Sequence, residues 1–453
     1  MTECNQNAFG FEEYFSRQVV GEFDGSQLTS DGGAMLLRAA DRKIGLLNRM
    51  TGCFTDSRQP ERVEHELGQM LAQRVYGLAL GYEDLNDHEE LRHDPLLAVL
   101  AGKREMGSPL AGKSTLNRLE LTPAGSGQQE RYHKIGYCAE ALDALLVDIF
   151  LEAHARAPRQ IVLDLDATDT PLHGRQEGRF FHGYYNHYCY LPLYIFCDDH
   201  LLCARLRPSN QDASAGSGEE VARIVRQIRR RWPHVRIILR ADSGFCREEL
   251  MAWCETHRVD YVFGLARNVR LRRRIGHAMQ KAKQERQRTG QAARRFSEFF
   301  YRTRKSWSRR RRVVAKCEQI QGKENPRYVV TSLGAEPWTA RALYQQLYCA
   351  RGEMENRIKE QLSLFSDRLS TETMRANQLR LYFSALAYVL VHALRRLALR
   401  GTEWAQAQAE TIRLKLLKIA AQVRVTARRI WIGYSGAYPW KHLFAAAWAN
   451  LHA

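Results

Sequence analysis

The order of strands and helices between residues 158 and 266 constrains the fold more than any other feature of this sequence. Residues 161–168 have the period of two that is typical of a half-buried strand, with Ile, Leu, Leu and Ala on one face and Val, Asp, Asp and Thr on the other. A two-stranded hairpin, a helix with one apolar face, a strand, a helix and a last strand are expected after it, at 184–206, 221–228, 235–241, 246–257 and 259–265. This alternation predicts a mixed α/β sheet covered by helices.

Helices are predicted on both sides of this α/β segment. Before it, apolar residues at helical spacing predict a helical region that could dock on DNA, with helices at 33–40, 62–80, 82–91, 115–119 and 139–153. After it, we expect a helix up to about residue 293 and strands at 296–302, 312–319 and 328–332. The C-terminal part is expected to be helical, from 338 past 360, at 377–399 and at 405–423.

The positive charge of the chain is concentrated in one interval. The 453 residues carry 68 Lys and Arg against 50 Asp and Glu, a formal net charge of +18. Residues 267–316 hold 19 of these basic residues and 2 of the acidic ones, which is +17. So one-sided a charge favours a polyanionic partner, which means nucleic acid or an anionic membrane.

The residues of this interval that are predicted to contact DNA phosphates are Arg272, Arg273, Arg274, Arg309, Arg310, Arg311 and Arg312. Trp307 stands between two basic clusters and is the candidate to stack on an unpaired base. A buried place in the protein core is the alternative for Trp307. A solvated face or mobile loop is the alternative for the interval as a whole.

Neither a membrane nor an export route is expected. The first 15 residues lack the basic and apolar regions of a signal peptide. The most apolar stretch, 379–399, contains Arg380, His392, Arg395 and Arg396 and therefore predicts a buried helix. The ten cysteines form no C-x-x-C pair, which favours reduced thiols in a cytoplasmic protein.

Two strand ends carry acidic residues. Asp164 and Asp166 share one face of the strand 161–168, and Asp242 follows the strand 235–241. Open α/β sheets build sites at the carboxyl ends of strands, so we expect these aspartates to meet. Adjacent carboxylates repel unless a cation neutralises them, and oxygen ligands suit Mg²⁺ or Mn²⁺. The simpler alternative is that Asp164 and Asp166 face solvent and that Asp242 caps a helix.

A further acidic residue comes from the helix that is predicted to begin near residue 338. Tyr348, Arg351, Glu355 and Lys359 are 3, 4 and 4 residues apart and so share one helix face, whereas Glu353 points elsewhere. Taken alone, this spacing is typical of an ordinary ladder of ion pairs.

Together these elements resemble the DDE transposases of bacterial insertion sequences, which have an RNase H-like core. The D-x-T element of such enzymes is matched at Asp166, and their second aspartate is matched by Asp242. Their Y-x2-R-x3-E helix signature is matched by Tyr348, Arg351 and Glu355. The segment 165–185, LDATDTPLHGRQEGRFFHGYY, is similar in particular to the insertion-sequence family numbered thirteen-eighty.

One position departs from the family signature. The signature usually continues to a lysine seven residues after the glutamate, and this chain has Leu362 there. Lys359 lies one helical turn after Glu355 and is the candidate substitute. The departure concerns the lysine and leaves the three acidic residues matched.

The resemblance implies an enzyme that cleaves the ends of an insertion sequence and transfers the freed 3′-OH to target DNA. Asp166, Asp242 and Glu355 would hold two Mg²⁺ or Mn²⁺ ions, with Asp164 as the alternative first ligand. Tyr348, Arg351 and Lys359 would support them. The expected partners are terminal inverted repeats, target DNA and a second copy of the chain, in a nucleoid-associated protein of the bacterial cytoplasm.

The resemblance also implies a division of the chain. A helical DNA-binding region would span 1–157, and the RNase H-like core would occupy 158–266 and 337–400, with the catalytic glutamate in its second part. Asp242 and Glu355 are 113 positions apart, which is too far for one strand and one helix, and the resemblance implies a basic β-rich insertion there, at 267–336. A C-terminal helical region would span 401–453.

Other functions stay open. Residues 107–114 fit the P-loop pattern G-x4-G-K-[ST] through Lys113 and Ser114, which makes an ATPase the alternative. However, residues 102–106 are too polar for the buried strand that precedes such a loop, and Pro109 removes an amide donor. Ser114 is more simply a helix cap. A nuclease that does not transpose and a non-catalytic DNA-binding protein are the remaining alternatives.

Three histidines, His173, His182 and His187, lie close together in the sequence. A zinc site would need a closer, convergent set of nitrogen and sulfur ligands. We therefore expect these imidazoles to contact DNA or local backbone groups.

Overall fold

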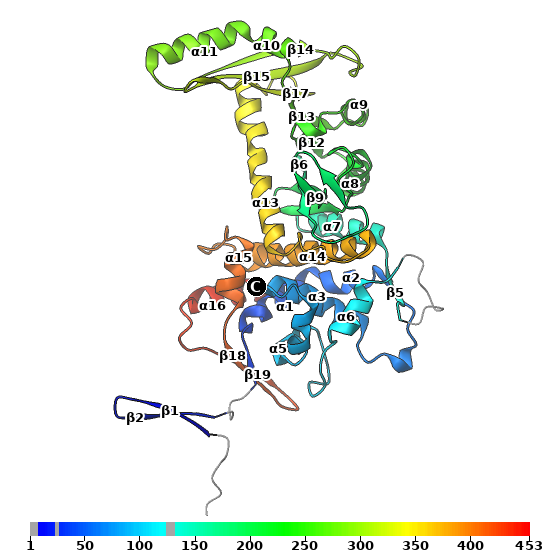
Figure 1. Ribbon diagram of the computed structural model, residues 1–453, viewed down its shortest axis with the longest axis vertical. Helices are drawn as coiled ribbons and strands as arrows, with labels where there is room; N and C mark the ends of the chain where they lie inside the picture. Colours follow the sequence, from blue (N-terminus) through cyan, green and yellow to red (C-terminus); the bar gives the residue numbers. More distant parts are fainter. Residues whose placement is uncertain (1–7, 23–26, 124–131) are drawn as a thin grey trace, which may run out of the picture. The chain divides into compact units, whose positions relative to one another are not determined.

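The computed structural model describes residues 8–22, 27–123 and 132–453, which form two compact units (Figure 1). The larger unit holds residues 48–59 and the described part of 118–392. The smaller unit holds the described part of 1–47 together with 60–117 and 393–453. This division differs from the five expected segments, because residues 139–152 belong to the sheet-containing unit and the C-terminal residues join the N-terminal ones.

One nine-stranded mixed sheet organises the larger unit. Its strands are β6 (Gln160–Ala167), β10 (Leu193–Cys197), β11 (His200–Arg205), β12 (Arg236–Ala241), β13 (Asp260–Leu265), β14 (Ala293–Tyr301), β15 (Arg311–Ile320), β16 (Lys323–Glu324) and β17 (Arg327–Thr331). They lie in the order β11-β10-β6-β12-β13-β17-β15-β14, with β16 on β15. β6, β12 and β13 run parallel, and the other neighbours pair antiparallel. The sequence prediction of a mixed α/β sheet is therefore confirmed.

Helices cover both faces of this sheet. On one face the helices are α7 (Ala139–Glu152), α8 (Ser217–Arg231), α9 (Glu248–Thr256), α10 (Val269–Arg274) and α11 (Gly276–Thr289). The other face carries a continuous helical run, made of α12 (Ala340–Ala342), a π-helical segment (Leu343–Tyr348), a 3-10 turn (Cys349–Arg351) and α13 (Gly352–Ser363). Alternation along β12 explains the two cores, since Ile237 and Leu239 face the first set and Ile238 faces the second.

The basic insertion, residues 267–336, extends the main sheet. β17 pairs antiparallel with β13, from Val262 opposite Thr331 to Leu265 opposite Tyr328. Without β17, β13 would be an open edge with unpaired backbone groups. Val313 on β15 contributes to one core and Val314 to the other, so apolar residues on both faces hold the extension in place.

Several short elements complete the larger unit. They are β4 (Phe54–Asp56), β5 (Ile135–Tyr137), β7 (Thr170–Pro171), β8 (Phe180–His182) and β9 (His187–Tyr190). β4 pairs with β5, and β9 lies between β7 and β8. The helices α2 (Leu46–Thr51) and α14 (Met374–Ala398) each contain residues of both units. By length and hydropathy α14 could cross a membrane, but 89% of its most apolar window is buried in the protein, as expected for a core helix.

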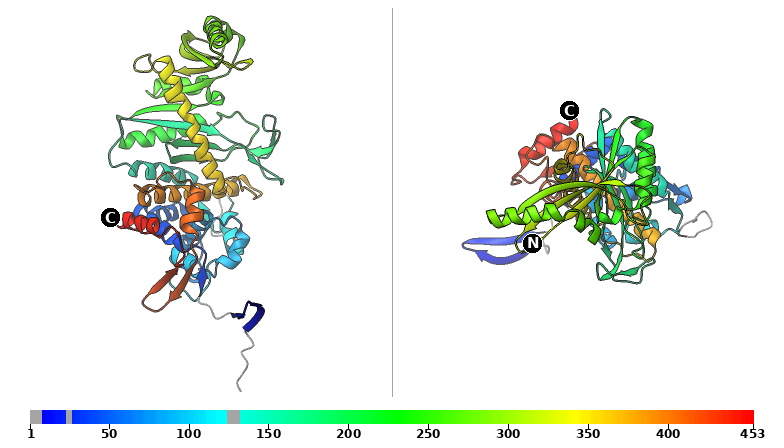
Figure 2. Two further views of the ribbon diagram at one scale, coloured as in Figure 1. Left: turned by 90° about the vertical axis from the view of Figure 1, so that its left-hand side faces the viewer. Right: turned by 90° about the horizontal axis from the view of Figure 1, so that it is seen from above.

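The smaller unit combines helices with two hairpins. Its helices are α1 (Met35–Ile44), α3 (Leu67–Leu80), α4 (His88–Leu91), α5 (Pro95–Leu100), the start of α6 (Lys113–Glu120), α15 (Ala409–Ile412) and α16 (Lys441–His452). The strands are β1 (Ala8–Tyr14), β2 (Arg17–Glu22), β3 (Leu28–Thr29), β18 (Ala421–Val425) and β19 (Ile430–Tyr434). The views in Figure 2 show α16 and the β18–β19 hairpin in red and orange-red.

The prediction of helices alone in 401–453 is wrong. The helix expected at 405–423 ends after a π-helical segment at Leu417, and Ala421–Val425 becomes a strand between β3 and β19. Ala421 and Val423 are buried, whereas Gln422 and Arg424 are exposed, so the segment has strand periodicity. Pairing with a strand about 390 residues away in the chain overrode its local helical preference.

Candidate active site

The two aspartates lie at the ends of neighbouring parallel strands. The last residues that β6 and β12 pair with each other are Leu165 and Ala241, and Asp166 and Asp242 come next along the two strands. Both carboxylates therefore belong to the carboxyl end of the sheet. The Asp242 Oδ1 also accepts a hydrogen bond of 2.8 Å from the Gly244 amide, which is the capping contact that the simpler alternative expected.

Arg351 joins the first aspartate to the glutamate of the helical run. Its Nη1 donates to Asp166 Oδ2 at 3.1 Å, and its Nη2 donates to Glu355 Oε1 at 3.4 Å. The Asp166 side chain is 18% exposed and the Glu355 side chain is 56% exposed. The aspartate is thus mostly buried and the glutamate is exposed, and the Arg351 guanidinium bridges the two.

The charges of these groups act on one another. Burial raises the pKa of Asp166 to about 6; the Arg351 guanidinium opposes this rise, while the charges of Asp242 and Glu355 add to it. Burial lowers the pKa of Arg351, but the surrounding carboxylates outweigh this effect and raise it. The raised pKa of Asp166 thus reflects its burial first and the neighbouring carboxylates second.

Gly264 allows Tyr348 to approach the backbone beside Asp242. A Cβ atom at Gly264, on β13, would lie 2.7 Å from the Tyr348 hydroxyl oxygen and 2.8 Å from the Ser243 amide nitrogen. No other residue fits there without a shift of the backbone. Sequence reasoning missed Gly264, although a glycine within a strand pattern is a signal of close backbone approach.

Asp164, the alternative first ligand, is used inside the protein. Its side chain is buried, and Arg240 donates to both of its oxygens, from Nε at 2.5 Å and from Nη2 at 2.7 Å. The third contact of this guanidinium, from Nη1, reaches the Leu347 carbonyl oxygen at 2.6 Å. With both of its oxygens occupied, Asp164 is a weaker ligand candidate than Asp166. Arg240 was missed by sequence reasoning, because no local pattern marks it.

The donor set fits a hard divalent cation by its chemistry. Asp166, Asp242 and Glu355 offer carboxylate oxygens, which Mg²⁺ and Mn²⁺ prefer. Within the described ranges no group of three His, Cys, Asp or Glu side chains is already arranged around a metal position. The Arg351 guanidinium lies between Asp166 and Glu355 and supplies the positive charge there.

Comparison with known protein families identifies the family of this chain. The family model described as "Transposase DDE domain group 1" matches residues 11–453. The chain belongs to this family of DDE transposases. Among solved structures, the transposase is similar to the piggyBac transposase synaptic complex with hairpin DNA, at 10% identity and a TM-score of 0.42, over 86% of this chain and 80% of that one. No curated protein matches the sequence.

Other predicted site residues lie on the surface of the transposase. Lys359 is exposed one turn after Glu355, and Leu362 is half-buried.

Among the predicted histidines, His187 contacts Asp169, with its Nε2 2.8 Å from the Asp169 Oδ2. Asp169 is thereby engaged by an imidazole, whereas Asp166 is engaged by Arg351.

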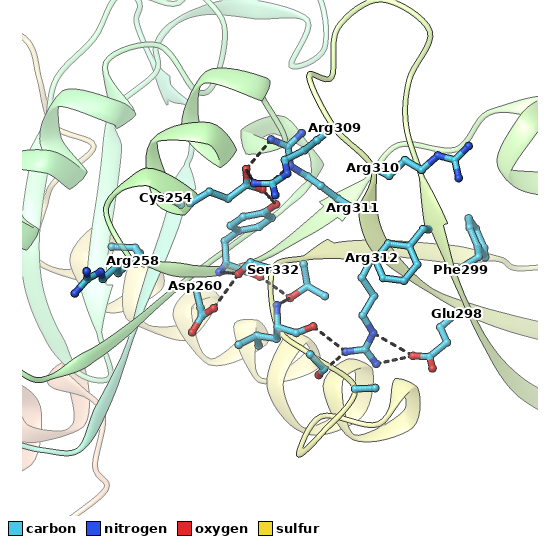
Figure 3. Close-up of a pocket in the computed structure, with 18 residues that line it drawn as sticks. Cys254, Arg258, Asp260, Glu298, Phe299, Arg309, Arg310, Arg311, Arg312 and Ser332 are labelled. Atoms are coloured by element: carbon cyan, nitrogen blue, oxygen red, sulfur yellow. Dashed lines mark hydrogen bonds and ion pairs between the residues drawn. The ribbon is translucent and has the colours of Figure 1, made fainter.

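The arginines of the basic interval divide into exposed and buried ones. Arg272, Arg273, Arg274, Arg309 and Arg310 are exposed. Arg311 is buried and binds Glu248 at 2.6 Å and Glu255 at 2.7 Å. Arg312 is buried and binds Glu298 at 2.5 Å, as Figure 3 shows. The expectation that all four residues of 309–312 face DNA is therefore corrected: β15 begins at Arg311, and the strand carries the last two side chains into the protein.

Trp307 is also internal. Its side chain is 5% exposed and packs edge-on against Tyr301, with ring centroids 5.7 Å apart. The Arg311 guanidinium lies 5.5 Å from the Trp307 ring centroid. The alternative of a buried core indole thus describes Trp307, and base stacking by this residue is not supported by its position.

We expect the two exposed arginines of this run to contribute to the salt dependence of DNA binding. Replacing Arg309 and Arg310 together with alanine should flatten the slope of log affinity against log salt by about 2 units, since each phosphate contact releases about 0.9 counterion. Titrations of duplex DNA across a salt series measure this slope. Arg230 and Arg231, an exposed pair on α8, provide a control that removes the same charge. Equal slopes for the two double variants would contradict the prediction.

In the P-loop-like segment 107–114, a carboxylate of the protein lies where a bound phosphate would be expected. The Glu89 Oε1 accepts a hydrogen bond of 2.8 Å from the Lys113 amide at the start of α6. A Cβ at Gly112 would lie 3.1 Å from the same Glu89 oxygen and 2.7 Å from the Arg92 Nη1. Residues 102–106 form turns and no strand. A carboxylate therefore occupies the place where a nucleotide phosphate would bind.

Replacing Lys113 with alanine should leave DNA cleavage unchanged in the absence of ATP. The Lys113 side chain is exposed and contacts Asn86 at 3.3 Å. Calorimetric titration with ATP is expected to give no binding to either protein. ATP hydrolysis that disappears in Lys113→Ala would refute this prediction and restore the ATPase function.

Proposed function

We propose that this transposase cleaves DNA at the ends of an insertion sequence and joins the freed 3′-OH to target DNA. Asp166, Asp242 and Glu355 are the proposed catalytic carboxylates. The observation that carries the proposal is that Asp166 and Asp242 follow neighbouring parallel strands and that Arg351 bridges Asp166 to Glu355, with the pKa of Asp166 raised to about 6. The concentration of charge in residues 267–316 supports DNA as the substrate.

Mg²⁺ or Mn²⁺, two ions in our proposal, would be held by the three carboxylates and would neutralise phosphate charge and lower the pKa of an attacking water. The protein supplies position. Asp166 and Asp242 are fixed by paired strands, and Tyr348 is fixed against Gly264. Arg351, already between two carboxylates, is placed to orient Glu355 or to hold a phosphate oxygen through its planar fork. Cleavage and joining are both in-line phosphoryl displacements, for which such positioning is the main requirement.

Finer features of the fold and assembly belong to the same proposal. The antiparallel strands β11, β10 and β6 followed by parallel β12 and β13 support an RNase H-like core. We further propose that two copies of the chain pair two element ends, and that the protein acts on the bacterial nucleoid. Membership of the insertion-sequence family numbered thirteen-eighty is supported by the segment 165–185.

The deciding experiment uses a DNA fragment that carries the imperfect inverted repeats flanking the gene. The full-length protein with Mg²⁺ should cleave at the repeat ends and join them to a target plasmid, and EDTA or Glu355→Gln should stop both steps. Cleavage without joining would indicate a nuclease. Binding without metal-dependent cleavage would indicate a non-catalytic DNA-binding protein.

Metal binding can be measured without activity. Mg²⁺ should stabilise the wild-type protein by about 1.4 kcal/mol at tenfold above its dissociation constant, because it binds only the folded carboxylate cluster. Thermal melting with and without Mg²⁺ measures this effect. The Asp242→Ala variant should show little stabilisation by Mg²⁺. The Asp260→Ala variant, which removes an aspartate from the amino end of β13, should keep this stabilisation. Equal stabilisation of both variants would argue against this metal site.

A further inference from the structure

The hairpin that follows the first carboxylate presents aromatic rings to solvent. β8 and β9 pair with Phe181 opposite Tyr188 and His182 opposite His187, in the blue-green segment of Figure 2. The exposed fractions are 42% for Phe180, 54% for Phe181, 85% for Tyr184 and 45% for Tyr188. Several large rings exposed on one short hairpin are typical of a binding surface.

The root of this hairpin is held firmly. The Tyr190 hydroxyl donates to the Glu177 carbonyl oxygen at 2.6 Å and accepts from the Asn377 amide group at 3.2 Å. The Ser209 hydroxyl donates to the Phe180 carbonyl oxygen at 2.9 Å. A rigid root fixes the direction of the exposed rings, which lowers the entropy lost when they bind a flat partner.

The turn of the hairpin connects the rings to one another. Asn186 has a φ of 60°, and its backbone amide donates to the His182 carbonyl oxygen at 2.8 Å. Tyr184 and Tyr185 pack edge to face with ring centroids 5.0 Å apart, and Tyr185 is stacked on His187 at 6.1 Å. Tyr184 therefore stands at the exposed end of a row of packed rings.

Charge and position indicate what these rings would contact. The Arg179 guanidinium lies 3.8 Å from the Tyr188 ring centroid. Arg175, four residues earlier in the sequence, is exposed. On the inner side, His187 binds Asp169, three residues after Asp166. Burial raises the pKa of Tyr185, and the charges of Asp169 and Asp166 add to this rise. The aromatic surface thus has cations beside it and lies next to the carboxylate cluster.

We propose that the β8–β9 hairpin binds an unpaired base of the DNA end, next to the phosphate that is cut, by stacking on Tyr184 and Phe181. The proposal rests on the proposed function, because it needs DNA at the carboxylate cluster. Every base presents a flat face to an aromatic ring, and the neighbouring arginines can pair with the adjoining phosphates. The hairpin would perform the role that the sequence assigned to Trp307, which is buried.

Binding of an oligonucleotide to the full-length protein tests this proposal without cleavage. The probe is a 20-base-pair duplex with a five-nucleotide dT extension that contains one 2-aminopurine, compared with the blunt duplex in EDTA. Wild type should bind the extended duplex more tightly and quench its fluorescence. Tyr184→Ala should weaken this preference by about 5- to 150-fold, the range of one stacking contact. Tyr184→Phe should retain it.

Two controls separate base stacking by the hairpin from the general loss of an exposed ring and from protein association. Trp448→Ala removes a ring that is 55% exposed on α16 and should leave the preference unchanged. Unchanged preference and quenching in both Tyr184→Ala and Phe181→Ala would overturn the proposal. A change of molecular mass in light scattering, with quenching intact, would mean that the surface binds a second protein chain and would also overturn it.

The two proposals can fail separately. If wild type cleaves and joins element ends but the hairpin variants keep base binding, only the inference about the hairpin fails. If wild type quenches the probe but never cleaves with metal, the proposed catalytic function fails.

Discussion

Alanine at Asp166, Asp242 or Glu355 should lower cleavage of element ends by at least about 10³-fold, the scale seen when a group that stabilises transition-state charge is lost in phosphoryl transfer. Binding of the same DNA should be largely retained, because most phosphate contacts are expected from the basic interval. A gel assay of single-turnover cleavage in Mg²⁺, with binding measured in EDTA, separates the two effects.

Glu353 is the matched control for Glu355. It is exposed on the same helix, α13, but its charge acts on Asp198, which is outside the carboxylate cluster. Glu353→Ala should therefore cleave at nearly the wild-type rate. Normal cleavage by Glu355→Ala together with loss of cleavage in Glu353→Ala would mean that the catalytic glutamate lies on the other face of α13. Cleavage that survives Asp166→Ala but not Asp164→Ala would move the first ligand by two residues.

Replacing Arg240 with methionine should destabilise the folded protein by about 3–5 kcal/mol, since it leaves the buried Asp164 carboxylate without its partner. Burial already raises the pKa of Asp164, and Arg240 opposes that rise. In the variant the rise is unopposed, so the free energy of unfolding should recover in part as the pH falls and Asp164 takes up a proton. Urea denaturation at several pH values measures both effects.

Arg236 gives the control on the same strand. Its Nε binds Asp260 at 2.8 Å, but its side chain is 45% exposed, so Arg236→Ala should cost only about 0–1 kcal/mol. Arg240 also holds the Leu347 carbonyl, next to Tyr348, so the methionine variant should lose more cleavage than its lower stability alone would cause. Equal stability of the two variants would contradict the role assigned to Arg240.

Local periodicity was enough to predict most of the central fold. The alternation of residues 161–168 corresponds to β6 (Gln160–Ala167), and the helix predicted at 139–153 corresponds to α7 (Ala139–Glu152). These segments were readable because each buries one face against the sheet, which imposes a period of two or 3.6 on its own residues. We expected the aspartates 166 and 242 to meet because open α/β sheets build sites at the carboxyl ends of strands, and the structure makes β6 and β12 neighbours.

Tertiary structure decided the features that depend on contacts between residues far apart in the sequence. Arg311 and Arg312 read as part of an exposed basic run, but Glu248, Glu255 and Glu298 neutralise them inside the protein. Residues 421–425 read as the end of a helix, but pairing with β3 and β19 made them a strand. The sequence by itself therefore determined the elements whose pattern is local, and the catalytic role of the acidic residues stays a prediction. The three-dimensional fold decided which charges face solvent, because a side chain's partner can come from any part of the chain.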